Sequence, residues 1–472
     1  MMRSLYSGVA GLKVHQTKMD VIGNNIANVN TVGFKSSAVN FSDVLYQTTQ
    51  VASGANENMG MTGRNPKQIG IGSQVASITS TVSTTGGTQR TDNALDCMIS
   101  GEAFFVVNYG GNNYYTKAGS FNVDASGTLC TAAGASVMGW PVNAEGTDIE
   151  RKEVQRLTVM SPENMTSQPE ATTKGYITGN VDASDTQLQS ENGVAMQVNF
   201  YDNIGNSYNL KLSMKSTDVE GEYTVVATDI LNSEGQSIFW ELDADGVTKK
   251  PTDITSFDFA GKTYTANITD NELTFGDVEG ALLKFNTATG GFTSINGEKA
   301  VVLDIAKGDT TSPFEEFSLD FSTITQYASN GKCALESQRG AVDGSGQGAG
   351  RTKGDMVGLS VDTSGKIYGS YDNGTTKMLG QIAVATFANA TGLEAIGDSM
   401  FATTQNSGEF DGIGKDITET GGSLTTGVLE MSNVDLATEF TQMITTQRGF
   451  QANSRIITTS DTMLEELISL KR

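Results

Sequence analysis

The chain has 472 residues, with 31 Lys and Arg against 54 Asp and Glu, so its formal net charge is −23 at pH 7. An acidic chain without a Lys/Arg cluster lacks the basic surface that binding to nucleic-acid phosphates requires. Hydrophobic residues make up 37% of the chain, while charged residues make up 18%, below the ~25% of ordinary globular proteins. The composition therefore excludes a disordered chain and favours several folded domains.

Residues that carry chemistry are scarce. The single histidine, His15, disfavours His-based catalysis and His-rich metal sites. Cys97, Cys130 and Cys333 are odd in number and match neither a CxxC spacing nor a disulfide framework. No run of about 20 apolar residues could span a bilayer, and the N-terminus lacks the apolar core of a cleaved secretory signal. We therefore expect no enzyme, no cofactor and no metal, in a protein that is cytosolic or leaves by another route.

The chain begins with apolar residues spaced by seven. This period predicts a helix over about 4–28, with Ser4 as its N-cap. His15 lies beside Gln16 on this helix, and we expect it to face solvent. The apolar stripe comprises Leu5, Val9, Leu12, Met19, Ile22 and Ile26.

An asparagine-rich segment, GNNIANVNTVGFK (23–35), follows the helix. Successive asparagines end a helix by bonding to nearby backbone groups, and Gly33 permits a sharp change of direction. We expect residues 31–75 to form a connecting hinge segment between the helix and the next domain.

The middle of the chain has the alternation of short β-strands, as in QVASITSTVST (74–84) and AFFVVN (103–108). Two similar segments, 123–129 (VDASGTL) and 361–367 (VDTSGKI), have the Asp, Ser and Gly of hairpin turns. The alternative, a Ca²⁺ loop, needs more acidic ligands and a terminal Glu. We therefore predict a hairpin turn at each segment.

Residues 149–335 differ from their flanks and look like an inserted outer β domain. Strands such as MQVNFY (196–201) alternate as in a sheet with one solvated face. The flanks, 76–148 and 336–429, would form an inner β domain from two distant pieces. The sequence leaves open whether the insert is one unit or two.

The far end repeats the seven-residue spacing and predicts a second helix over about 433–470. Ser432 followed by Asp435 resembles a capping box just before the periodic run. Together, 1–30 and 430–472 would form a terminal helical core domain. The apolar positions of this second stripe include Leu436, Phe440, Met443, Phe450, Ile457 and Leu464.

Such spacing at both ends suggests that the two helices pair as a coiled coil, although two ordinary amphipathic helices docked on the body would show the same pattern. Each fully buried apolar side chain contributes about 1.5–3 kcal/mol, whereas ordering each residue costs about 1–2 kcal/mol of backbone entropy. A lone hairpin of helices therefore has too little core. We expect both ends to be poorly ordered in the isolated subunit and to fold against neighbouring copies. The predicted class is α+β multidomain, with a terminal coiled-coil segment and nested, mainly β domains built from discontinuous segments.

Both ends resemble one known family. Residues 23–35 resemble the N-terminal signature of bacterial flagellar axial proteins, the rod and hook family, and 432–470 resembles the matching C-terminal segment. Within that family the similarity is greatest to hook proteins, whose outer and inner β domains resemble 198–214 and 115–129; an Arg is common there at the place of Lys117. The signature residues are Asn24, Asn25, Ala27, Asn28, Gly33 and Phe34.

The resemblance implies a structural subunit of the flagellar hook. Such subunits pass unfolded through the flagellar type III export apparatus, polymerise into a curved extracellular tube, and act as a universal joint between rod and filament. Their partners are other copies of the chain, the hook cap, the rod and the hook–filament junction proteins, with no nucleic acid and no membrane span. Both apolar stripes would then form the assembly interface, at Leu5, Val9, Leu12, Met19, Ile26, Leu436, Phe440, Met443, Phe450, Ile457 and Leu464.

Three alternatives remain at this point. A distal rod-type axial protein with an enlarged insert would share both ends. An extracellular β-rich adhesin would explain the β body but neither the twin stripes nor the asparagine-rich signature. An enzyme is the third, but Cys97, flanked by apolar residues, is expected to be a small buried hydrophobe. Covalent crosslinking through a cysteine is conceivable, because some hooks of this family are crosslinked, but nothing in the sequence identifies a partner.

Overall fold

The computed structural model describes residues 2–54, 62–143, 148–243, 249–269, 272–276, 278–305 and 312–470. The chain divides into two compact units. The first consists of Met1–Asn164, Val357–Ser370 and Thr376–Arg472, and the second of Met165–Met356 and Tyr371–Thr375. Two helices and many strands in discontinuous segments confirm the predicted α+β multidomain class.

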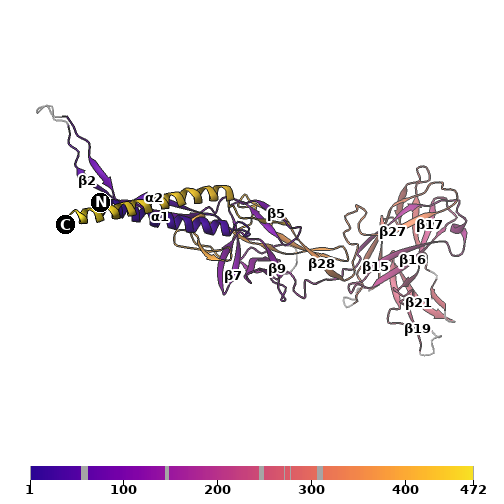
Figure 1. Ribbon diagram of the computed structural model, residues 1–472. Helices are drawn as coiled ribbons and strands as arrows, with labels where there is room; N and C mark the ends of the chain where they lie inside the picture. Colours follow the sequence, from indigo (N-terminus) through magenta and orange to yellow (C-terminus); the bar gives the residue numbers. More distant parts are fainter. Residues whose placement is uncertain are drawn as a thin grey trace. The chain divides into compact units, whose positions relative to one another are not determined.

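The first unit contains the two long helices, α1 (Met2–Ala27) and α2 (Leu436–Ser469), which lie side by side with both chain ends at one tip (Figure 1). α1 already includes Met2, so Ser4 lies inside the helix and is not its N-cap. Met and Arg, at positions 2 and 3, are good helix formers, and this favours the earlier start.

The start of α2 differs from its prediction by three residues. Its N-cap is Asp435, whose carboxylate accepts hydrogen bonds from Ala437 N at 3.0 Å and from Thr438 Oγ1 at 2.7 Å. Ser432 lies outside the helix, where its hydroxyl accepts a hydrogen bond from Val434 N. The carboxylate satisfies a free amide of the first turn and so fixes the start of the helix.

The described part of residues 31–75, predicted as a connecting hinge, forms strands, and one strand pair packs on α1. β1 (Ser37–Asp43) pairs antiparallel with β4 (Ser73–Ser80), and both contact α1. Between them, β2 (Tyr46–Gln50) pairs with β3 (Lys67–Gly70) in a hairpin whose strands are largely exposed.

The β body of the first unit is built from both ends of the chain, and its central strands follow the order β30-β11-β7-β8-β33-β32. Trp140 lies in its core and donates hydrogen bonds from Nε1 to the carbonyls of Lys152 and Ile413. A short 3₁₀ helix, η3 (Ala390–Gly392), precedes β32. The strands are β5 (Thr88–Arg90), β6 (Cys97–Ser100), β7 (Phe104–Tyr109), β8 (Asn112–Thr116), β9 (Phe121–Val123), β10 (Leu129–Thr131), β11 (Ser136–Pro141), β12 (Gln155–Arg156), β30 (Thr376–Ile382), β31 (Val384–Ala385), β32 (Glu394–Gly397), β33 (Met400–Ala402), β34 (Ser423–Thr426) and β35 (Val428–Glu430), together with parts of β28 (Gly354–Val361) and β29 (Lys366–Tyr371).

Both predicted hairpin turns are confirmed. Leu129 of β10 pairs with Val123 of β9, and Gly127 between them has a φ of 79°. In the second copy of the pattern, Asp362 N donates to Lys366 O at 2.8 Å between β28 and β29. Hydrogen bonds within each turn occupy the Asp side chains, as expected of a structural turn.

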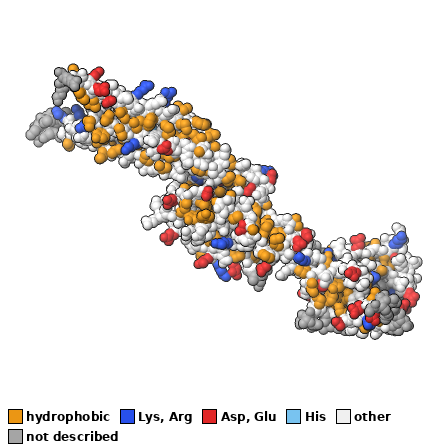
Figure 2. Space-filling model, turned by 60° about the horizontal axis from the view of Figure 1, so that its bottom comes forward, with side chains coloured by type: hydrophobic (Ala, Val, Ile, Leu, Met, Phe, Trp, Pro, Cys, Tyr) orange, Lys and Arg blue, Asp and Glu red, His pale blue; other side chains and the backbone are white. Residues whose placement is uncertain are grey.

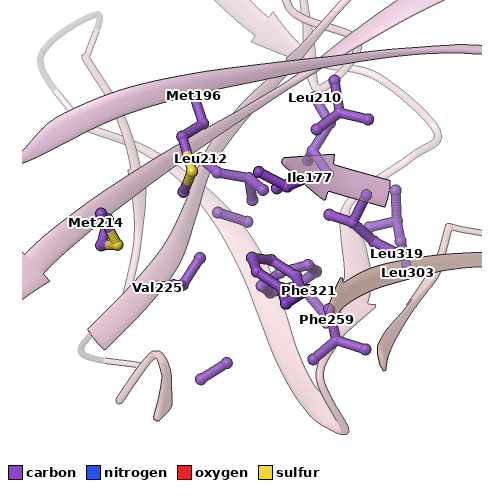
Figure 3. Close-up of a cluster of buried hydrophobic side chains, with 14 of the residues drawn as sticks. Ile177, Met196, Leu210, Leu212, Met214, Val225, Phe259, Leu303, Leu319 and Phe321 are labelled. Carbon is purple, nitrogen blue, oxygen red and sulfur yellow. The ribbon is translucent and has the colours of Figure 1, made fainter. Parts of the chain in front are cut away.

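The second unit packs two sheets around one hydrophobic core (Figure 3). One sheet has the order β15-β16-β17-β23-β24, and the other has the order β22-β21-β20-β25-β26-β14-β27. In β15 buried and exposed residues alternate, which confirms the predicted sheet with one solvated face. The strands are β13 (Thr166–Ser167), β14 (Lys174–Asn180), β15 (Val194–Tyr201), β16 (Ser207–Ser216), β17 (Glu222–Leu231), β18 (Trp240–Leu242), β19 (Lys249–Pro251), β20 (Ser256–Phe259), β21 (Lys262–Thr269), β22 (Glu272–Phe275), β23 (Ala281–Phe285), β24 (Phe292–Ile295), β25 (Ala300–Asp304), β26 (Phe317–Thr325) and β27 (Ala334–Arg339), with the 3₁₀ helix η2 (Thr186–Gln189).

The limits of the units differ from the predicted insert limits of 149 and 335. Residues 149–164 belong to the first unit, because β12 pairs with β11 there. Residues 336–356 belong to the second unit, because β27 pairs with β14 inside its seven-stranded sheet. Strand pairing across the chain, which local composition does not reveal, sets these limits.

Candidate assembly surface

The line along which α1 meets α2, which we call the seam, combines small and polar residues with the side chains of Ile456 and Ile457, which lie against Gly8. A Cβ atom at Gly11 would lie 2.6 Å from Asn453 Nδ2, and one at Gly449 would lie 2.7 Å from the ring of His15. A side chain at Gly11 would therefore displace the Asn453 side chain, and one at Gly449 would displace the His15 ring. The seam therefore depends on a close approach of the two helix backbones.

Asn25 ties the two helices to the first strand pair. This side chain is 1% exposed, and its Nδ2 donates to Glu439 Oε1 at 3.0 Å and to Ser37 O at 2.9 Å. Ser37 N in turn donates to Asn25 Oδ1 at 3.0 Å. Because residue 25 faces 439 while Gly11 faces Asn453, the two helices are antiparallel.

The predicted assembly residues lie beside the seam and are only partly covered within one subunit. Figure 2 shows hydrophobic side chains gathered over the helical part of the first unit. The exposed members are Val9, Leu436 and Phe440. The half-buried members are Leu5, Leu12, Met19, Ile26, Met443, Phe450, Ile457 and Leu464.

The asparagine-rich segment ends α1 as its residue types predict. Asn28 Nδ2 donates to the carbonyl of Asn24 at 2.9 Å, and its Oδ1 accepts from Thr31 Oγ1 at 3.1 Å. Asn24 and Ala27 are exposed, while Phe34 is half-buried. These side-chain bonds add to the backbone bond from Asn28 N to the Asn24 carbonyl and close a turn at the end of the helix.

Gly33 turns the chain from α1 into the β body. Its φ is 69°, and a Cβ atom there would lie 2.7 Å from Ala118 N. Gly33 N donates to the carbonyl of Glu430 at 2.8 Å, just before α2. The position therefore requires glycine both for its backbone angle and for the space it leaves.

A buried ion pair, which we call the junction pair, fixes the base of both helices. Lys35 Nζ lies 2.7 Å from Glu430 Oε1, and the two side chains are 1% and 0% exposed. Lys35 also donates to Thr84 O, and Gly86 N donates to the same carboxylate oxygen. Burial lowers the pKa of the neighbouring Lys117 to about 8, against the opposing effect of the Glu430 carboxylate.

His15 is half-buried, so the prediction that it faces solvent is wrong. Its ring packs edge-on against Phe41 of β1, with ring centres 6.0 Å apart, and lies against Gly449. Nδ1 is buried and has no hydrogen-bond partner among the described residues. Burial lowers the pKa of His15 from its ordinary 6.5, and the nearby charge of Lys18 lowers it further.

Acidification should therefore weaken the helix pair. Because the folded pKa lies below 6.5, the folded chain binds this proton less readily than the unfolded chain does. The contribution of neutral His15 is complete above about pH 6.5 and is lost as pH falls toward the lowered pKa. His15 is the only histidine, so one imidazole signal in NMR follows the titration directly. In polymerised tubes, the helical circular dichroism of the native chain should fall as the pH falls, and that of His15→Gln should change less; an equal fall in both would contradict the prediction.

The three cysteines are free, and their surroundings do not activate them. Cys97 is fully buried, as predicted, and burial raises its pKa to about 12. Burial also raises the pKa of Cys130, and it raises that of Cys333 to about 11. Protonated thiols are poor nucleophiles, so these sites give no support to covalent crosslinking.

The described part of the chain contains neither a membrane-spanning helix nor a metal-binding cluster. Neither helix there combines the length and apolar character of a membrane crossing. No group of three or more His, Cys, Asp or Glu within that part could hold a metal ion.

Comparison with known proteins is consistent along the whole chain. Residues 5–35 match the family described as Flagella basal body rod protein, and 98–178 match the Flagellar hook protein FlgE/F/G D1 domain. Residues 164–341 match the Flagellar basal body protein FlaE D2 domain, and 425–470 match the Flagellar basal body rod FlgEFG protein C-terminal family.

Full-length relatives decide the family. The chain is 36% identical to the flagellar hook protein FlgE of Borreliella burgdorferi, with all of both chains covered. It is 35% identical to FlgE of Treponema pallidum, again with full coverage of both chains. The chain belongs to the flagellar hook protein family.

Membership of the hook protein family also decides between the alternative functions. A flagellar basal-body rod protein FlgG of Bacillus subtilis matches over the full length at 29% identity, less than the 36% and 35% of the two hook relatives named above. A structural hook subunit is thus favoured over a rod-type protein or an adhesin, and the chain is a component of the flagellar axial structure. Hook proteins are a structural family and not an enzyme family.

Sequence reasoning missed several residues of this hook-family chain. Gly11, Gly449 and Asn453 form the seam, and Glu430 completes the junction pair. The glycines carried a signal, because glycine inside a long helix is costly unless close packing requires it. Glu430 carried none, since 395 residues separate it from its partner Lys35.

Proposed function

We propose that this chain polymerises head to tail into the curved tube of the flagellar hook, with α1 and α2 forming its inner core. One observation carries the proposal: the helix pair leaves its predicted apolar stripes partly uncovered in an otherwise acidic chain. Contacts that repeat without closing into a ring generate a helical filament. Other copies of the chain would cover these stripes.

The small number of buried residues in the helix pair supports the proposal that the helices become ordered on assembly. α2 has only two fully buried residues, Thr446 and Ser460, among those described. An isolated helix pair with so little buried apolar surface gains little from tertiary packing. Folding of both ends would then be coupled to polymerisation, as in other segments that order on binding.

The distribution of charge supports soluble subunits before assembly. The second unit contains 13 Lys and Arg against 29 Asp and Glu, a net charge of −16. Like charge keeps free subunits apart. The apolar stripes of the first unit are then the surfaces through which the subunits associate.

The role that we propose for the tube in the flagellum rests on the same family membership. The tube would act as an extracellular universal joint between rod and filament. Its subunits would pass through the flagellar type III export apparatus without a cleaved signal, and would meet the hook cap, rod and hook–filament junction proteins. We propose that the chain has no enzymatic activity and needs no cofactor.

The proposal is tested by electron microscopy of the purified chain under polymerising conditions. The native chain should form tubes, and Met443→Asp with Phe450→Asp should abolish them, because each buried charge costs several kcal/mol. The β-sheet circular dichroism should be unchanged.

A matched control places the same charges on apolar residues away from the helices. Ile204→Asp with Val219→Asp changes two exposed side chains of the second unit. This variant should still form tubes. Tubes from the helix variant would exclude the stripe as an assembly surface, and failure of the native chain to polymerise would contradict the proposed function.

A further inference from the structure

A groove of about 390 Å³ lies on the flank of α1, between this helix and β4. Its lining includes Tyr6, Val9, Lys13 and Val14 of α1, with Gln74 and Val75 of β4. Helical spacing turns Tyr6, Val9 and Lys13 away from Gly8 and Gly11, which face α2. Tyr6 is 60% exposed, so the described part of the chain leaves the groove largely open.

α2 extends past the beginning of α1. Gly11 lies opposite Asn453, and Asn25 lies opposite Glu439, so paired positions place Met2 opposite Thr462. The residues of α2 beyond this point continue for about 10 Å at 1.5 Å per residue. We call this segment, Met463–Leu470, the overhang.

The overhang carries apolar side chains that its own subunit does not cover. Met463 is 44% exposed, Leu467 is 48% exposed and Ile468 is 69% exposed. Figure 2 shows hydrophobic side chains on this end of the first unit. An apolar helix end of this kind requires a partner surface, and the groove on α1 is one.

The overhang cannot occupy the groove of its own subunit. Val9 lies at the level of residue 455, so Leu467 is displaced from it by about 18 Å along the helices. The groove also lies on the far side of α1 from the seam. An overhang that enters this groove must therefore come from another molecule.

Charge favours the overhang of a second copy as that occupant. Asp461, Glu465 and Glu466 are the charged side chains of α2 between 456 and 470, and all three are exposed and acidic. Lys13 lines the groove, and Arg3 lies near the start of the same helix. Opposite charges beside two apolar surfaces favour this pairing over contact between two grooves.

We propose that the groove beside α1 receives the α2 overhang of a neighbouring copy in the polymer. The inference rests on the proposed function and specifies one of its contacts. The groove and the overhang are different surfaces of one chain, so the contact is heterologous and leaves a free groove at one end and a free overhang at the other. Repetition of this contact extends the polymer.

Mixed crosslinking tests the contact between copies. One batch of full-length chain carries Val9→Cys and another carries Leu467→Cys, both with Cys130→Ser and Cys333→Ser; Cys97 is buried. Tubes polymerised from an equal mixture should give disulfide-linked dimers on mild oxidation, since a disulfide requires Cα atoms within about 7 Å. The control uses Val357→Cys, at an exposed position of the first unit, in place of Leu467→Cys. Tubes from this mixture should give no disulfide-linked dimers.

A charge reversal provides a second test if a cysteine variant does not assemble. Lys13→Glu should raise the critical concentration for polymerisation about two- to fivefold, as expected for a surface ion pair. Glu465→Lys in the same chain should restore assembly, because each contact then has opposite charges again.

The two proposals fail separately. Normal tubes without crosslinks between residues 9 and 467 would overturn the groove contact and leave the hook assignment intact. If the cysteine variants do not assemble, the charge reversal decides. A loss of assembly in Lys13→Glu that Glu465→Lys does not restore would also overturn the groove contact. A native chain that forms no tubes would instead contradict the proposed function.

Discussion

Replacing Glu430 by Gln should destabilise the first unit by about 3–5 kcal/mol, the usual cost of leaving a buried charge without its partner. Gln keeps the shape of Glu430 but removes the negative charge beside Lys35, which is 1% exposed. Lys117 lies close enough for the Glu430 charge to affect its pKa, so the substitution removes a favourable negative charge from two lysines.

Tryptophan fluorescence can report this loss from the first unit alone. The chain has two tryptophans, Trp140 in the first unit and Trp240 in the second. With Trp240→Phe as the common background, urea unfolding followed through Trp140 gives the stability of the unit that contains the junction pair.

An exposed ion pair provides the control. Arg90 and Asp92 lie 2.6 Å apart, but their side chains are 82% and 73% exposed. Asp92→Asn should cost about 1 kcal/mol or less. Adding Lys35→Met to Glu430→Gln should recover much of the loss, because no unpaired charge then remains at that position. Equal effects of Glu430→Gln and Asp92→Asn would contradict the stabilising role of the junction pair.

Replacing Gly11 by Leu should prevent tube formation or raise the critical concentration at least tenfold, about 1.4 kcal/mol per subunit. The Leu side chain would occupy the space of Asn453, since a Cβ alone would lie 2.6 Å from its amide nitrogen. Overpacking of a tight contact costs about 1–3 kcal/mol or more. Sedimentation of polymer at several subunit concentrations measures the effect.

Gly23 is the matched control on the same helix. A Cβ there meets nothing within 4 Å, so Gly23→Leu gains the higher helix propensity of Leu, up to about 1 kcal/mol, without a clash. Gly23→Leu should polymerise at least as well as the native chain. If the smaller change Gly11→Ala weakens assembly, adding Asn453→Ala should restore it. If Gly11→Leu assembled normally, close contact at the seam would not be required.

The terminal helices were predictable because their apolar spacing is local. The stripes at Leu5–Ile26 and Leu436–Leu464 predicted both elements, and the Asp and Gly of residues 123–129 predicted a hairpin turn. Such signals depend on neighbours within a few residues, so one sequence contains them in full.

The seam and the junction pair depend on contacts across the chain. Apolar periodicity marked Ile457, which lies against Gly8 in the seam, whereas the contact also uses Gly11, Gly449 and Asn453, which belong to no apolar stripe. Lys35 pairs with Glu430 because the C-terminal part of the chain folds back beside the N-terminal part. His15 was misplaced for the same reason: Phe41 and Gly449, which cover it, come from other elements.

The antiparallel helices bring residue 2 and residue 470 to the same tip of the first unit (Figure 1). A fluorescent protein or affinity tag fused to either terminus would therefore add its bulk at one place, beside the overhang. The tip of the turn between β15 and β16, at Asn203 and Ile204, is a better place for an inserted label, because Ile204 is 66% exposed. Imaging of live cells should begin with probes at that turn.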